Sequence, residues 1–272
     1  MLRKLIAYDF RCTWKMMVTL FITSFVAAIL SAVCGIMQQY IPFDVESVMY
    51  TLAFSGLMMG QMFLFMLSYL CALGTILISG IHYYKKIVSD EAYLTFTLPA
   101  TVGQHLTAKL VTGFVWTMTG IVVFLINLII ISIPSALLIS DAVPDTEMGE
   151  VVIGTLQAAD VAMIIGVVVL LLALLATELL LAYLALTIGG VIANKYKALV
   201  GIGLYWVGNS VVSGVMMFAA IIISAIFAAM LPLSADWTIA VVIWLCAAVV
   251  GGFGVLYYFF NRKLLTNKLN LP

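Results

Sequence analysis

Few side chains in this sequence could carry chemistry, and the first candidate is Glu178, a carboxylate inside the apolar run VAMIIGVVVLLLALLATELLLAYLAL. A charged group in lipid is costly, so Glu178 must face other helices or water and have a partner. It could then serve as a proton site, or as a gate that changes partner during a transport cycle. A fixed hydrogen bond between helices is the favoured interpretation.

Sequence motifs for familiar chemistry are absent. The chain has no G-x-x-x-x-G-K-[ST] nucleotide loop, no H-E-x-x-H zinc helix and no G-x-S-x-G nucleophile elbow. Its two histidines, His82 and His105, stand apart in the sequence, and we interpret both as residues at the inner membrane edge rather than as ligands or bases. Its four cysteines show neither a C-x-x-C pair nor zinc-ligand spacing. We therefore expect no catalytic residue, cofactor or metal in this chain.

The composition predicts an integral membrane protein. Of the 272 residues, 65% are hydrophobic and only 9% are charged. Soluble domains are about half apolar and about a quarter charged. No soluble fold could bury this much apolar surface, so we expect a multi-pass protein of the cell membrane, with the lipid bilayer as its main surroundings and no nucleic-acid partner.

The distribution of charge predicts the topology. All 12 Lys and Arg residues fall within residues 3–15, 85–109, 195–197 and 262–268. The segments between these groups hold nine of the 12 acidic residues, of which Glu178 lies inside a span, and no Lys or Arg. Because positive loops stay in the cytoplasm, we expect both termini and the 82–109 loop to be cytoplasmic.

Six apolar segments are long enough to cross a bilayer, which takes about 20 helical residues. Residues 1–16 precede them with an amphipathic pattern, in which Leu2 and Trp14 lie on the apolar face and Lys4 and Asp9 on the polar face. This pattern predicts an interfacial helix under the inner leaflet. We predict an all-α fold that forms one transmembrane domain over residues 1–272, with spans at about 17–38, 48–80, 107–132, 160–190, 198–230 and 237–260.

The stretch from His82 to Lys109 is the longest polar interruption on the basic side of the chain. Ser89 can cap a short helix over about residues 90–97, and Pro99 ends it. The first turn of this helix carries acidic side chains, which the helix dipole favours, and two aromatic side chains project from one face. We predict that it docks into a groove of another protein through Asp90, Glu91, Tyr93 and Phe96.

The run YYKKIVSDEAYLTFTLPAT, followed by HLTAKL, closely resembles the cytoplasmic loop of bacterial ABC-2 type transporter permeases. The C-terminal NRKLLTNKLNL and the six-span layout are also similar, so the resemblance covers nearly the whole chain. It implies an ABCG-like, type V exporter-like fold with a connecting helix at the N-terminus. In this class the 90–97 segment would be the coupling helix that contacts the ATPase.

The resemblance also implies partners. Two separate ATP-binding cassette subunits would bind ATP and Mg²⁺, and a second permease subunit, identical or related, would complete the transporter. The pathway would lie between spans 2 and 5 of the two permeases, which makes Gln61, Trp206 and Asn209 candidate pathway residues. A structural role as polar contacts between helices is the favoured interpretation for Gln61 and Asn209, and for Asn127 in span 3.

The resemblance implies an exporter of an amphipathic or hydrophobic substrate, such as a drug, an antimicrobial peptide or a lipid-like molecule. It does not distinguish among these cargoes. The competing hypothesis is an ion-coupled secondary transporter or channel that uses Glu178 and needs no ATPase. A third is a membrane scaffold for another enzyme or sensor. The ATPase partner separates the first hypothesis from the other two.

Overall fold

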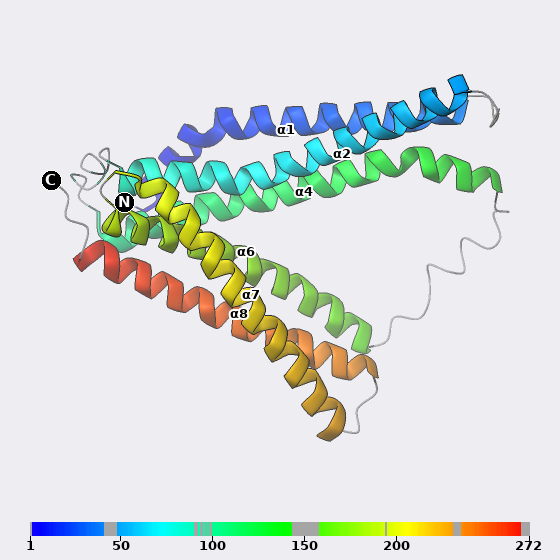
Figure 1. The fold of residues 1–272 in the computed structure, drawn as a ribbon. Coiled ribbons are helices and arrows are strands. Elements are labelled where there is room, and N and C mark those ends of the chain that lie inside the picture. Colours follow the sequence, from blue (N-terminus) through cyan, green and yellow to red (C-terminus); the bar gives the residue numbers. More distant parts are fainter. Residues whose placement is uncertain are drawn as a thin grey trace. The chain divides into compact units, whose positions relative to one another are not determined.

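A computed structural model of the chain describes residues 2–40, 48–89, 100–142, 158–193, 195–230 and 235–267, together with Ala92, Thr95 and Thr97. Regular structure within these ranges is helical, and six of the helices are long and apolar enough to cross a membrane. The predicted all-α fold with six such helices is therefore confirmed. Figure 1 shows the elements, which are α1 (Leu2–Tyr40), α2 (Val48–Tyr83), the π-helix η1 (Tyr84–Val88), α4 (Val102–Ala142), α6 (Ala158–Ile192), α7 (Lys197–Met230) and α8 (Ala235–Asn267).

The chain divides into two compact units, each with its own packing. The first comprises Met1–Phe10, Ser79–Phe114 and Thr155–Pro272, and the second comprises Arg11–Ile78 and Val115–Gly154. Helices α1, α2 and α4 each contribute residues to both units.

In the first unit, α6 is the central helix and packs against α7, α8 and η1 (Figure 1). Small residues allow these close approaches, because a side chain at the crossing would keep the helices apart. A Cβ atom added to Gly254 of α8 would lie 2.9 Å from Thr177 Oγ1 of α6. The Thr177 hydroxyl also donates to the carbonyl of Val250, at 3.1 Å.

In the second unit, Asn127 of α4 joins three helices. Its side-chain Nδ2 donates to Ser24 Oγ of α1 at 2.6 Å and to Ser68 Oγ of α2 at 2.9 Å. The two serine hydroxyls are 3.2 Å apart, and all three side chains are buried. Asn127 therefore makes the polar contact between helices that the sequence favoured.

The first helix differs from the prediction in one respect. Residues 1–16 were expected to form a separate interfacial helix, but α1 runs without a break from Leu2 to Tyr40. Asp9 was expected on the polar face of that helix, yet it is buried, with 1% of its surface exposed. The reason is that it contacts ionisable side chains from distant parts of the chain, which the local pattern does not contain.

Pro134 does not end the third long helix, because α4 continues to Ala142 with the proline inside it. A proline removes one backbone hydrogen bond, and membrane helices tolerate this loss when neighbouring helices provide contacts. The carbonyl that loses its donor is that of Ile130, four residues earlier, whereas Gln39 Nε2 of α1 donates to the Pro134 carbonyl itself at 2.6 Å. A Cβ atom at Gly35 would lie 2.9 Å from the proline ring, so α1 approaches closely at this point.

Candidate functional site

The predicted coupling residues Asp90, Glu91, Tyr93 and Phe96 lie outside the described residues. Their surroundings are described on both sides, from η1 through Ser89 and from Ala100 onward. The Ser89 hydroxyl donates backward to the carbonyl of Lys85, so this described bond closes the last turn of η1. The candidate site therefore comprises the described residues on the two sides of the loop, which we call the loop base.

A buried ion cluster joins the two ends of the 82–109 stretch. Asp9 Oδ1 of α1 pairs with Lys109 Nζ of α4, and it lies 3.2 Å from His82 Nε2 of α2. Lys109 Nζ and His82 Nε2 are 2.9 Å apart. Lys109 is only 5% exposed, so Asp9 compensates a charge that has little contact with water.

A second network of uncharged groups holds the end of α2 against α6 and α8. The Tyr83 hydroxyl lies 2.8 Å from Thr187 Oγ1 and donates to Asn261 Oδ1 at 3.2 Å. The rings of Tyr83 and Tyr183 stack with their centroids 4.1 Å apart. Tyr183 in turn donates to the backbone carbonyl of Lys109 at 3.3 Å. All of these side chains are buried or nearly so, so the network joins the end of α2 to α6 and α8 away from water.

The segment that follows α2 also packs directly on α6. Ile87 and Val88 of η1 are buried, and η1 contacts α6. Gly190 of α6 provides the space, because a Cβ atom there would overlap the Val88 side chain. The segment that leads into the loop is therefore packed on α6 through η1.

The sequence did not reveal these clusters. His82 and His105 were interpreted as isolated residues of the membrane edge, but His82 contacts two charged groups and His105 is 1% exposed. Asp9, His82 and Lys109 lie far apart in the chain, so no spacing rule connects them. Their one shared signal is that each lies close to an end of its long apolar helix.

Glu178 has the partner that its position requires. It is half-buried on α6, and the Tyr205 hydroxyl of α7 donates to its Oε2 at 3.0 Å. This contact is a hydrogen bond between two helices, of the kind that the favoured interpretation predicts. A carboxylate with a phenol partner can also gain and lose a proton, so the geometry alone leaves the proton-site hypothesis open.

The three predicted pathway residues lie in different units. Gln61 of α2 belongs to the second unit, where its Oε1 accepts a hydrogen bond of 3.0 Å from Gln38 Nε2. Trp206 and Asn209 of α7 belong to the first unit. Trp206 is 72% exposed and Asn209 is half-buried. Their spacing of three residues places them on neighbouring positions of one helix surface.

The described fold defines a polytopic α-helical membrane protein with a polar cluster at the base of one loop. Comparison adds no closer assignment, because no protein-family model, curated protein or solved structure matches the chain.

Proposed function

We propose that this chain is the membrane-spanning permease subunit of an ABC-2 type ATP-binding cassette transporter. In this proposal it exports an amphipathic or hydrophobic substrate, with ATP and Mg²⁺ bound by two separate ATPase subunits. The loop sequence YYKKIVSDEAYLTFTLPAT suggests the class. The observation that carries the proposal is the buried cluster of Asp9, His82 and Lys109, because it joins both ends of that loop.

The loop base is suited to passing force from an ATPase to the membrane helices. A coupling element must be attached rigidly, since a flexible attachment would absorb the movement of the partner. The ion cluster joins α1, α2 and α4, and the Tyr83 network joins α2 to α6 and α8. Pressure on residues 90–97 would therefore act on several membrane helices together.

Features of α2 and α7 support a second permease subunit. A Cβ atom at Gly56 or Gly60 of α2 would meet no described atom within 4 Å. Such a small-xxx-small pair lets another membrane helix approach closely. On α7, Asn209 is polar and Trp206 is exposed, and polar groups facing lipid are unfavourable unless another helix covers them. In our proposal the second permease, identical or related, covers these two surfaces and completes the pathway.

Replacing Glu91, Tyr93 and Phe96 together by alanine should release the ATPase. Aromatic anchors in a groove usually dominate such an interface, so we expect co-purification with an ATP-binding protein to weaken at least about thirtyfold. The measurement is a pull-down of the detergent-solubilised protein from its own cells, followed by an ATPase assay. The matched control replaces Val48, Met49 and Leu52 by alanine, three exposed side chains at the opposite end of α2.

Both variants should elute as monodisperse protein in gel filtration. If the parent brings down no ATPase, the permease proposal fails. If both triple variants lose the ATPase equally, the coupling role of residues 90–97 fails.

The hydrogen-bonded Glu178 supports one alternative function, an ion-coupled transporter or channel. Under the permease proposal, Glu178→Gln keeps an oxygen that accepts the Tyr205 hydrogen bond, so ATPase binding and stability should change little. The alternative predicts that liposomes containing the purified chain conduct protons and that Glu178→Gln abolishes this flux. A pH-sensitive dye trapped in the liposomes measures it. A proton flux in the parent that the glutamine variant lacks would favour the alternative.

A further inference from the structure

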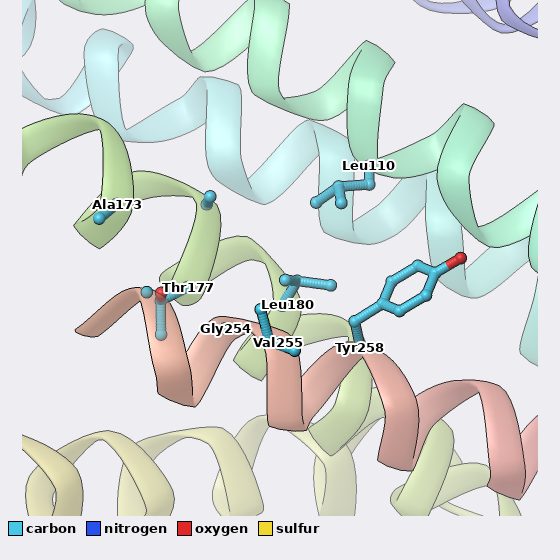
Figure 2. A pocket seen from close by; sticks show the side chains of 9 residues that line it. Leu110, Ala173, Thr177, Leu180, Gly254, Val255 and Tyr258 are labelled. Carbon is cyan, nitrogen blue, oxygen red and sulfur yellow. The ribbon is translucent and has the colours of Figure 1, made fainter. Parts of the chain in front are cut away.

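An apolar cavity of about 280 Å³ opens between α4, α6 and α8 in the first unit (Figure 2). Its walls include Leu110 of α4, Ala173 and Leu180 of α6, and Gly251 and Val255 of α8. Tyr258, one of the residues that line it, also carries a polar group. The cavity therefore has the character of a hydrocarbon site with one polar margin.

Small residues leave this space open. Ala173, Ala176, Gly251 and Gly254 all line the cavity and offer little or no side chain to fill it. A Cβ atom at Gly251 would meet no described atom within 4 Å. Because the lining is apolar, water gains no hydrogen bonds there, and a hydrocarbon chain is the favoured occupant.

The polar margin combines a phenol, a hydroxyl and a guanidinium. The Tyr258 hydroxyl lies 3.0 Å from Thr107 Oγ1 of α4. A Cβ atom at Gly103 of α4 would be 3.5 Å from Arg262 Nε and 3.8 Å from the Tyr258 hydroxyl, which places both groups beside the start of α4. Arg262 is exposed, and among the described residues no carboxylate pairs with it. Arg262 therefore places a positive charge at this margin.

The position of Arg262 along α8 corresponds to a membrane boundary. Residues 237–261 contain no charged side chain, and at about 1.5 Å per residue they are long enough to cross the hydrocarbon core. Arg262 and Lys263 are the first charges beyond this stretch. Tyr258 lies one helical turn before Arg262, so the cavity adjoins the level at which lipid headgroups lie.

We propose that this cavity binds one anionic phospholipid. Its acyl chain lies along Gly251, Val255 and Leu180, and its phosphate pairs with Arg262, beside the Tyr258 hydroxyl, which donates to Thr107 Oγ1. The apolar lining selects the chain, and the positive charge distinguishes an anionic from a zwitterionic headgroup. The proposal concerns a lipid bound to the protein from the surrounding bilayer, and it holds whether or not the chain is a permease.

Native mass spectrometry of the full chain in detergent tests the acyl site. The purified protein is titrated with dioleoyl phosphatidylglycerol and, separately, with dioleoyl phosphatidylcholine. Gly251→Leu should fill the cavity and exclude at least two methylenes, which weakens both lipids by about tenfold or more. Gly252→Leu is the matched control, because Gly252 is adjacent and exposed but does not line the cavity.

Replacing one charge tests the headgroup site without filling the cavity. Arg262→Gln should weaken phosphatidylglycerol about fivefold and phosphatidylcholine by less, because the choline cation offsets the charge of the same phosphate. Lys263→Gln removes the adjacent exposed charge and should have a smaller effect on the anionic lipid. Arg262 is exposed, so this variant should fold even if Gly251→Leu does not.

Three results would overturn the proposal. The first is equal binding of the two lipids by the parent protein. The second is an equal loss of phosphatidylglycerol binding in Arg262→Gln and Lys263→Gln. The third is a loss of the dimer peak in Gly251→Leu while lipid binding is unaltered. That result would mean that a second copy of the chain, and not a lipid, covers the cavity.

Discussion

Replacing Asp9 by alanine should destabilise the protein by about 3–5 kcal/mol, since it leaves the buried Lys109 without its carboxylate partner. Removing one member of a buried pair costs more than the pair contributes, because the remaining charge is uncompensated. His82 cannot replace Asp9, because a protonated imidazole beside the lysine would add positive charge. We expect the melting temperature in detergent to fall by roughly 10 °C, measured by the recovery of monodisperse protein after heating.

Two further variants are controls for the stability measurement on Asp9→Ala. Arg11→Ala removes an exposed charge on the same helix and should leave the melting temperature nearly unchanged. The double variant Asp9→Leu and Lys109→Met replaces the pair with apolar side chains and should recover most of the loss, because no charge is left buried. If Asp9→Ala has the melting temperature of the parent, Lys109 does not depend on Asp9, and the ion cluster does not stabilise the loop base.

The second large effect is expected at Gly189, where α6 meets the start of α7. A Cβ atom there would lie 2.6 Å from the Gly201 nitrogen, 2.7 Å from the Lys197 oxygen and 2.8 Å from the Gly201 Cα. All three are backbone atoms, so no rotamer change can relieve the contact. Gly189→Val must therefore push the two helices apart, at a cost of about 3 kcal/mol or more. The melting temperature should fall by an amount comparable to that for Asp9→Ala.

Gly203→Val is the matched control for this substitution. Gly203 lies on α7, one half-turn beyond Gly201, and a Cβ atom there would meet no described atom within 4 Å. The same side chain should then be accommodated with little change in stability. Equal losses in the two variants would show that valine acts on the helices themselves and not on their contact.

The glycines show which structural features the sequence alone can predict. The fourth span was predicted to end at about residue 190, but α6 continues to Ile192. Gly189 and Gly190 lie inside it and admit neighbouring groups, one from α7 and one from η1. The fifth predicted span, at about 198–230, contains four glycines, which could either break the helix or allow close packing. The structure has it as one continuous helix, with Gly201 against Leu186. A glycine pattern indicates that a residue without a side chain is required at those positions, and only the packing shows which neighbouring group needs the space.

Composition and local pattern determined the class of fold. Six long apolar helices follow from residue type alone, since an uncharged run of sufficient length satisfies its own backbone hydrogen bonds and needs no particular partner. The partner of Glu178 could be anticipated for the same reason, because a carboxylate among apolar residues requires one. Which residue provides it, Tyr205, came from the tertiary structure.

The tertiary structure alone decided the loop base and the cavity. As separate positions in the sequence, the three members of the ion cluster give no indication of a site. They form a cluster because α1, α2 and α4 bring Asp9, His82 and Lys109 within hydrogen-bond distance. The cavity exists because small residues of α6 and α8 lie side by side next to Leu110 of α4. These residues are far apart in the sequence, so no local pattern indicates their contact. Helix formation depends on neighbours along the chain, so the sequence determined it. Charge compensation and empty space depend on neighbours in three dimensions, so only the folded chain determines them.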